Sequence, residues 1–318
     1  MKKKYSLVLD LGGTNTVAAM FDREGSMIGK KAMATVPVSG PDDFLRRAGS
    51  LILGMLEKKG SSIKDIEGFC MGSPGPLDTK KGIMLYSANF KGWKNVNFKK
   101  YFTGLLGTEC IFENDVNLAG LGEFERELKG KFNNAVILFI GTGLGGVYIE
   151  DSRILRGKSG FACEFGHINI EPNGLPCGCG SKGCLESYVS AYGIGKRLKK
   201  LHEHSAKWRF FVDSLPERTP KGLYGKAVKG DKMALEFFRE TGLYLGSGLK
   251  TLINTFNPDV IALGGGVGKA LRFILPSAKE YLKKNVTRAF LDDVKIVRAR
   301  FLSDAALYGG YLLLKNGN

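Results

Sequence analysis

The chain has 318 residues, of which 43% are hydrophobic and 25% charged, a composition typical of a soluble globular protein with two domains. No apolar run approaches the length of a membrane span, and the short apolar stretch before Asp10 does not resemble a secretory signal. The formal charge is +16, but the basic residues are spread along the chain without a recognition motif, so we expect a solvated basic surface with no specific nucleic-acid partner and no membrane partner.

The first motif is a glycine turn between two short strands. Residues 5–11 and 17–21 are predicted to be strands, and Gly12–Thr14 joins them. Consecutive glycines let backbone N–H groups approach an anion, and the threonine adds a hydroxyl. Asp10, at the edge of the turn, is poorly placed for a core and well placed for a metal ion. Taken alone this is a weak signal, because ordinary hairpins use the same residues.

Two more predicted strands end in polar turns. After an amphipathic helix over residues 41–59, the strand 66–71 runs into Gly72–Pro76. This turn is either a ligand loop of the kind found at strand ends in open α/β sheets or a simple connection between strands. The strand that begins at Cys110 delivers Asp115 to the start of a helix predicted over 117–128. An aspartate in that place is either a helix cap or a catalytic group, and the local sequence does not decide between them.

A second glycine turn follows the strand predicted over residues 135–140. Gly141–Gly146 has the spacing of a dinucleotide-binding fingerprint, but that fingerprint requires a helix next, and residues 147–151 alternate like a strand. The unit of strand, glycine turn and strand therefore occurs once in each half of the chain. Two such turns suit a polyphosphate held from two sides. Because Phe139 stands where the first copy has Asp10, we expect one Mg²⁺ with a nucleotide.

The segment Glu164–Glu186 carries the strongest chemical signal. Its four candidate metal ligands are His167, Cys177, Cys179 and Cys184. One histidine with three thiolates is a closed structural zinc set. Cys163 as a fourth thiolate in place of the histidine, and thiols without metal, are the alternatives. Because side chains alternate along a strand, the carboxylate of Glu164 and the histidine face one ligand only if the backbone bends near Gly166.

The remaining cysteines are scattered, so no disulfide framework is predicted, and a reducing, cytoplasmic location is favoured. His202 and His204 are expected to be exposed and without partners. The other predicted elements of the second half are a helix from 185 kinked at Gly193 and Gly195, a connection over 208–224, a helix from Asp231 to Asn257, a strand over 259–263, a turn at Gly264–Val267 and a helix over 304–315.

These motifs resemble the ROK sugar kinases, within the hexokinase and actin-like superfamily. The resemblance covers essentially the whole chain and rests on Asp10–Thr14, Gly72–Pro76, Glu113–Asn117, Gly141–Gly143, Glu164–His167 and the highly specific Cys177–Glu186. It implies an α/β fold with two actin-like (ribonuclease H-like) domains and a cleft between them. We expect the smaller domain at residues 1–115 plus 303–318 and the larger at 116–302.

The resemblance also implies an activity, the ATP-dependent phosphorylation of a hexose at its 6-hydroxyl, as in a glucokinase, with Asp115 as general base. The residues implied to bind the sugar are Gly72, Asn114, Asp115, Glu164, His167 and Glu186. Those implied to hold Mg-ATP are Asp10, Gly12, Gly13, Thr14, Gly141, Thr142, Gly143, Gly265 and Gly266, with Asp10 assisting Mg²⁺. Those that match the family's structural zinc ligands are His167, Cys177, Cys179 and Cys184.

Three alternatives stay open. The chain is also compatible with an N-acetylhexosamine kinase of the same family, with a non-catalytic sugar-sensing regulator, and with a nucleic-acid binder. Regulators of the family carry an added N-terminal winged helix, for which a phosphate motif at Asp10 leaves no room, and an intact Asp115 favours catalysis. The family commonly forms dimers or tetramers, so a homodimer or homotetramer is expected. Cys163 stands where the family usually has glycine, which bears on the choice of sugar.

Overall fold

The computed structural model describes residues 4–36, 39–87, 90–300 and 303–317, which form an α/β protein. The chain divides into two compact units. The first comprises Met1–Lys131, Ile149–Cys163 and Phe301–Asn318, and the second comprises Phe132–Tyr148 and Glu164–Arg300. The predicted domain limits, 1–115 with 303–318 against 116–302, remain a prediction, because compactness alone does not show which segments fold independently.

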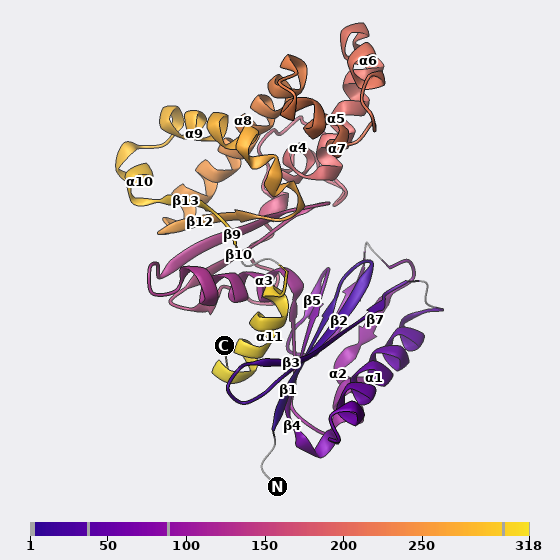
Figure 1. Cartoon of the computed structure of the whole chain (residues 1–318). Coiled ribbons are helices and arrows are strands. Elements are labelled where there is room, and N and C mark those ends of the chain that lie inside the picture. Colours follow the sequence, from indigo (N-terminus) through magenta and orange to yellow (C-terminus); the bar gives the residue numbers. More distant parts are fainter. Residues whose placement is uncertain (1–3, 37–38, 88–89, 301–302, 318) are drawn as a thin grey trace. The chain divides into compact units, whose positions relative to one another are not determined.

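A five-stranded sheet in the order β3-β2-β1-β4-β8 organises the first unit (Figure 1). β1 pairs antiparallel with β2 and β2 with β3, whereas β4 and β8 are added in parallel. The strands are β1 (Tyr5–Leu11), β2 (Asn15–Phe21), β3 (Met27–Ala34), β4 (Ile66–Ser73) and β8 (Cys110–Asn114). A small antiparallel sheet holds β5 (Leu77–Asp78), β6 (Ile83–Tyr86) and β7 (Lys94–Asn97).

Alternation along β1 determines which helices cover each face of this sheet. Leu7 and Leu9 belong to the core that α1 (Pro41–Lys58) and α2 (Phe98–Leu106) help to form. Val8 points to the other face, because successive side chains of a strand alternate. There it contacts α11 (Ala305–Asn316), where a Cβ added to Gly310 would lie 2.5 Å from Val8 Cγ1. The first unit is thus a sheet with helices on both faces.

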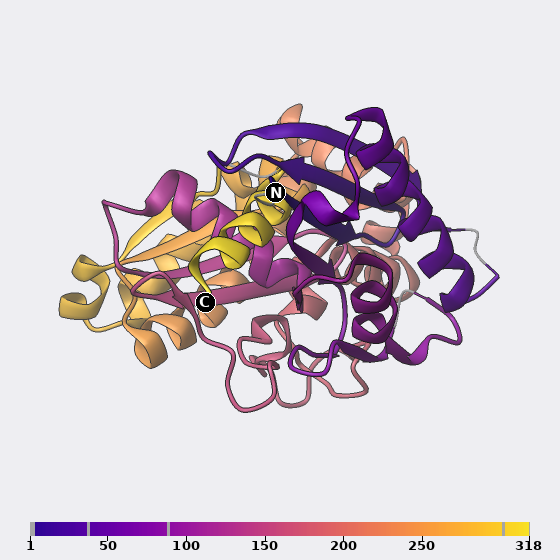
Figure 2. The same ribbon diagram turned by 90° about the horizontal axis from the view of Figure 1, so that it is seen from below.

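The helices α3 (Asp115–Glu123) and α11 pack against each other at very short range, as both views show (Figure 1 and Figure 2). A Cβ added to Gly122 would lie 2.1 Å from the carbonyl oxygen of Ala305, and one added to Gly309 would lie 1.9 Å from that of Leu118. Only glycine permits these backbones to meet. A π-helical turn, Phe124–Leu128, continues α3.

The second five-stranded sheet has the order β11-β10-β9-β12-β13, which repeats the order of the first sheet. Again a meander supplies three strands, and two parallel strands follow. The strands are β9 (Asn134–Ile140), β10 (Leu144–Glu150), β11 (Arg153–Ile154), β12 (Val260–Gly264) and β13 (Lys295–Arg298). The internal repeat predicted from the two glycine turns is therefore confirmed, and it extends to the whole sheet.

The second unit carries most of the helices, and α8 and α9 lie side by side (Figure 1). The α-helices are α4 (Glu186–Val189), α5 (Ala191–His204), α6 (Ala206–Asp213), α7 (Pro220–Val228), α8 (Lys232–Phe256), α9 (Leu271–Asn285) and α10 (Arg288–Asp293). Single 3-10 turns occur at Ile63–Asp65, Phe165–His167 and Gly266–Lys269. Within the described residues, no helix has both the length and the apolar character needed to cross a bilayer.

Several local predictions were wrong. The helix predicted from residue 185 breaks at Ser190, whose hydroxyl caps α5 by accepting the N–H of Gly193, and not at the glycines. The segment predicted to be a connection, 208–224, contains most of α6 and part of α7, whose N-caps are Ser205 and Thr219. His202, predicted to have no partner, lies 2.9 Å from a carboxylate oxygen of Asp213.

Gly122→Ala is expected to lower the free energy of unfolding by about 1–3 kcal/mol or more, because the new methyl group meets the backbone of α11. Gly104→Ala is the matched control: this helical glycine of α2 is exposed, and nothing lies within 4 Å of the added Cβ. The control should gain about 0.5–1 kcal/mol. Urea unfolding monitored by circular dichroism checks both. Equal effects of the two substitutions would contradict close packing of α3 on α11.

Candidate active site

In the first unit, parallel strand pairing brings two predicted site residues, Asp10 and Gly72, together with Glu113. Asp10 of β1 lies opposite Gly72 of β4, which in turn lies opposite Glu113 of β8. A Cβ added to Gly72 would be 3.5 Å from Asp10 Oδ1 and 3.5 Å from the Cα of Asp115. The missing side chain therefore leaves room for two carboxylates to approach each other at one edge of the sheet.

Burial, together with the smaller effect of the neighbouring charge of Asp115, raises the pKa of Asp10 from 3.8 to about 7. Both causes disfavour the ionised carboxylate. A divalent cation held there would counter both, because it stabilises the ionised form. The donor set thus fits the predicted Mg²⁺, with Asp10 as the residue that would hold it.

Asn114 and Asp115 sit at the start of α3, where backbone N–H groups need acceptors. The Asn114 side-chain oxygen accepts the N–H groups of Val116, at 2.9 Å, and Asn117, at 3.2 Å. This cap uses the amide oxygen and leaves the NH₂ group as the part that can donate to a ligand. Asp115 Oδ1 accepts the N–H of Val116 at 2.9 Å.

Glu113, for which the sequence suggested no role, is a buried carboxylate with a nearly complete set of donors. It is only 1% exposed. Its Oε1 accepts the backbone N–H of Asn114 and the side-chain amide of Asn117, both at 2.9 Å, and its Oε2 accepts Arg156 Nε at 2.7 Å. It therefore fixes the backbone immediately before the predicted general base. A charged side chain in a buried strand indicates that an oppositely charged partner exists, but the neighbouring sequence did not identify Arg156 as that partner.

In the first glycine turn, hydrogen bonds hold Gly12 and the carbonyl group of Thr14, whereas the N–H groups at the centre have no acceptor among the described residues. The N–H of Gly12 donates to the carbonyl of Asn15 at 3.1 Å, and the Thr35 hydroxyl donates to the Gly12 carbonyl at 2.8 Å. The Thr35 N–H donates to the Thr14 carbonyl at 2.8 Å. Within the described chain, the N–H groups of Gly13 and Thr14 have no acceptor. Two adjacent free donors of this kind make an anion-binding nest.

The second glycine turn repeats this arrangement in the second unit. The N–H of Gly141 donates to the carbonyl of Gly143 at 2.9 Å. From α5, the N–H groups of Ala191 and Tyr192 donate to the carbonyls of Gly141 and Thr142, at 2.9 and 3.1 Å. The N–H groups of Thr142 and Gly143 again find no acceptor among the residues that the structure describes. Both predicted phosphate turns therefore present a matching pair of donors.

The four predicted zinc ligands meet. Their ligand atoms all lie within 4.8 Å of one another. His167 Nδ1 is 3.6 Å from Cys177 Sγ, and Cys179 Sγ is 3.7 Å from Cys184 Sγ. Zinc–sulfur bonds of about 2.3 Å in a tetrahedron place sulfur atoms about 3.8 Å apart, so this donor set fits zinc. The set contains the histidine and not Cys163.

The two carboxylates that flank the zinc ligands have different surroundings. Glu164 is exposed and precedes the 3-10 turn Phe165–His167, so the backbone bend expected at Gly166 is confirmed. Because Nδ1 faces the thiolates, the histidine keeps Nε2 for another partner. Glu186 is half-buried, and its Oε2 accepts the N–H of Leu144 at 2.8 Å.

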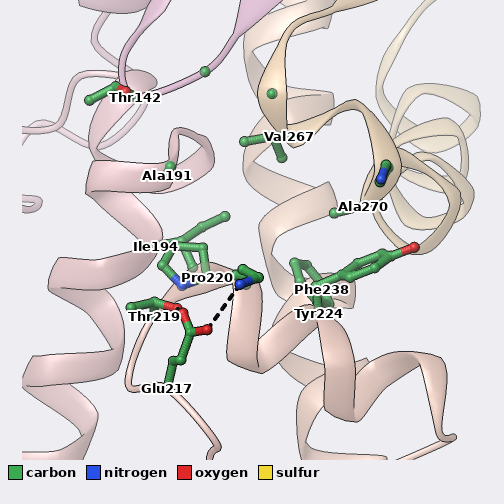
Figure 3. Close-up of a pocket in the computed structure, with 14 residues that line it drawn as sticks. Thr142, Ala191, Ile194, Glu217, Thr219, Pro220, Tyr224, Phe238, Val267 and Ala270 are labelled. Atoms are coloured by element: carbon green, nitrogen blue, oxygen red, sulfur yellow. Dashed lines mark hydrogen bonds and ion pairs between the residues drawn. The ribbon is translucent and has the colours of Figure 1, made fainter. Parts of the chain in front are cut away.

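A cavity of about 520 Å³ in the second unit joins the second glycine turn to the turn after β12 (Figure 3). Gly141, Thr142 and Gly266, three of the residues predicted to hold ATP, all line it. Gly265 has φ 94°, and a Cβ there would be 2.5 Å from the carbonyl oxygen of Ile140. Val267, of the predicted turn Gly264–Val267, also lines it; the lining residues missed from the sequence are Ala191, Ile194, Glu217, Thr219, Pro220, Lys221, Tyr224, Phe238, Lys269 and Ala270.

The lining is largely apolar, as a nucleoside pocket requires. Figure 3 shows Ile194 on one side and Tyr224 with Phe238 on the other. Within the lining, Lys221 Nζ pairs with Glu217 Oε1 at 3.0 Å. The sequence had no signal for Glu217, Lys221 and Tyr224, because 208–224 has neither a motif nor a clear helical period. Ile194 and Phe238 belong to predicted helices, but a helical period does not show which side chains line a cavity.

Comparison with known proteins identifies the family. The model of the ROK family matches residues 6–317. The chain belongs to the ROK family. It is 29% identical to the glucokinase of Thermotoga maritima over 317 residues, which are 99% of this chain and 98% of the relative. Its two-unit α/β structure is the actin-like fold of ROK sugar kinases.

Two solved ROK structures resemble the fold closely. A ROK family transcriptional regulator described as a homologue of the Escherichia coli MLC protein superposes with a TM-score of 0.84 at 25% identity, over 98% of this chain and 78% of the regulator. A ROK glucokinase from Streptomyces griseus in complex with glucose and AMPPNP superposes with a TM-score of 0.76 at 27% identity, over 98% and 100% of the two chains. The family thus includes both enzymes and regulators.

We expect one zinc ion per chain in protein purified without chelators, and loss of that zinc in His167→Ala and Cys184→Ser, which remove ligands from the four-residue set. Cys163→Ser is the matched control and should retain it. Elemental analysis by mass spectrometry measures all three. Zinc lost from the control and kept by His167→Ala would instead assign the fourth ligand to Cys163.

Arg156→Met is expected to lower the free energy of unfolding by about 3 kcal/mol, because it leaves the buried charge of Glu113 without its cation. Arg153→Met, at an exposed position of β11, should change it by less than about 0.5 kcal/mol. Denaturant unfolding of both variants decides the point. A neutral result at Arg156 would mean that the ion pair does not stabilise this edge.

Proposed function

We propose that the protein phosphorylates the 6-hydroxyl of a hexose with ATP, as a glucokinase does. The observation that carries the proposal is the meeting of Asp115 and Asp10 at Gly72. One carboxylate there is suited to take a proton, and the other to hold a cation beside a phosphate chain. Likeness to the Thermotoga maritima and Streptomyces griseus glucokinases supports this assignment.

ATP would be held through its phosphates and its adenosine. The paired N–H groups of Gly13 and Thr14 and of Thr142 and Gly143 would donate to phosphate oxygens. The cavity beside Gly266 would take the adenosine. Mg²⁺, held by Asp10, would supply positive charge to the transferring phosphoryl group.

The sugar would be bound by donors and acceptors together, because hydroxyl groups both give and accept hydrogen bonds. The Asn114 NH₂ group and His167 Nε2 are available to sugar hydroxyls, and Glu164 and Glu186 would accept from them. Zinc would serve as the structural support of this loop. We also propose that the protein works as a homodimer or homotetramer.

Asp115 would act as the general base. Its carboxylate would accept the proton of the 6-hydroxyl while the hydroxyl oxygen attacks the γ-phosphorus and the bond to the β-phosphate oxygen breaks. The products are ADP and the sugar 6-phosphate. The Glu113–Arg156 pair would hold the backbone that presents this base.

The second candidate function is that of a sugar-responsive regulator without turnover, and likeness to the solved ROK regulator favours it. Within the kinase class, an N-acetylhexosamine is the alternative substrate. Cys163, with φ 68°, is next to Glu164, so its side chain bears on which sugar fits. We expect glucose to give the highest kcat/KM in a coupled ADP assay over hexoses and amino sugars. No ADP from any sugar would favour the regulator.

Asp115→Asn is expected to fold and to bind glucose but to lower kcat by about 100-fold or more, because the amide cannot accept the hydroxyl proton. Asp293→Asn, an exposed control, should keep the wild-type kcat. The coupled ADP assay gives kcat, and calorimetry gives the affinity for glucose. A wild-type rate in Asp115→Asn would end its assignment as general base.

A further inference from the structure

Glu186 contacts two parts of the second unit that differ in chemistry. Its Oε2 accepts the N–H of Leu144, the residue that follows the second glycine turn, at 2.8 Å. Its Oε1 lies 3.9 Å from Sγ of Cys177 in the zinc cluster. One half-buried carboxylate therefore contacts both the segment that carries the metal ligands, Glu164–Glu186 (the metal loop), and the second glycine turn, Gly141–Leu144 (the phosphate turn).

The absence of side chains at two glycines makes this contact possible. A Cβ added to Gly143 would lie 2.4 Å from Glu186 Oε2. A Cβ added to Gly166, on the metal loop, would lie 2.2 Å from the carbonyl oxygen of Leu144 and 3.5 Å from Cβ of Glu186. Residues of the metal loop therefore lie against the turn both at Gly143 and at the carbonyl group of Leu144.

The backbone after Glu186 fastens the same turn. Ala191 and Tyr192 donate to the carbonyls of Gly141 and Thr142, only a few residues beyond the carboxylate. These bonds fix the carbonyl side of the turn, and Glu186 fixes the N–H of Leu144. One segment therefore holds both carbonyl groups and one N–H group of the turn, while the N–H groups of Thr142 and Gly143 have no acceptor among the described residues.

The zinc ligands determine where Glu186 stands. Cys184 precedes it by two residues, and its carbonyl accepts the N–H of Ser187 at 2.9 Å. Much of the loop before it is exposed to solvent, including Glu171 and Cys179, and so has little apolar packing of its own. A loop of this kind depends on its metal for a fixed position.

We propose that Glu186 is a positioning residue that couples the metal loop to the phosphate turn Gly141–Leu144. The metal site then influences the affinity of the protein for nucleotide phosphates as well as for sugar. The proposal rests on the proposed function where it concerns ATP. The coupling itself concerns only the residues of this loop and this turn.

The test measures the dissociation constants of a non-hydrolysable ATP analogue and of adenosine, without sugar, by calorimetry. Glu186→Ala with its zinc retained, and wild type freed of zinc by a chelator, should each bind the analogue about tenfold or more weakly, because the acceptor of the Leu144 N–H is lost or displaced. Affinity for adenosine should stay within about twofold, because the apolar pocket is unchanged.

Two variants make the test specific. Glu186→Gln keeps an oxygen that accepts the Leu144 N–H, so its affinity for the analogue should stay within about threefold of wild type. Glu171→Ala, an exposed carboxylate of the same loop, should match wild type. Equal losses for the analogue and adenosine, or an unchanged affinity in Glu186→Ala, would overturn the coupling.

Amide hydrogen exchange tests the coupling without any nucleotide. Exchange at residues 141–146 should become about tenfold faster or more in Glu186→Ala and in zinc-free protein, and should stay at the wild-type rate in Glu171→Ala. If wild type binds neither nucleotide nor adenosine, the proposed kinase function fails, and the exchange rates still decide whether Glu186 couples the loop to the turn. Unchanged exchange in both altered proteins would refute the inference.

Discussion

The in-register parallel pairing of β1, β4 and β8 is the constraint on which the candidate site depends. It places Asp10, Gly72 and Glu113 in one row at the sheet edge. A slip of one residue in any pair would turn every side chain of that strand to the opposite face. The candidate site therefore requires Gly72 at the centre of the row and the carboxylates of Asp10 and Glu113 on either side of it. The Leu7 and Val8 faces, each covered by helices, specify the register.

The second sheet has the equivalent strand pairing, but a different residue stands at the position of Asp10. There Phe139 lies opposite Gly264, so the position equivalent to Asp10 is apolar. The turn that follows has the same pair of N–H groups without an acceptor among the described residues, and the carboxylate beside it, Glu186, does not come from the strand before the turn. Repetition of the fold thus supplies two similar turns, while an acidic residue on the preceding strand occurs only in the first. The second unit adds the metal loop and the apolar cavity.

Much of this arrangement follows from short-range patterns. Alternation and glycine placement predicted β1, β2, β9 and β10, and the caps Asp231 and Asn257 bounded α8 correctly. Ligand spacing predicted that the zinc ligands meet, because those residues are close in sequence. The Glu113–Arg156 pair and the cavity side chains were missed, since each needs contacts between segments far apart in the chain. The break at Ser190 was missed because a serine cap competed with the more conspicuous glycines.

The first unit is assembled from three separated segments, and α11 is the last of its elements to be synthesised. Until the ribosome releases those residues, the Val8 face of β1 and the glycine-lined side of α3 have no covering helix. Nearly the whole second unit emerges before that happens. The nascent chain must therefore hold an apolar sheet face open to water through most of its translation, a state in which chaperone capture and aggregation compete with folding.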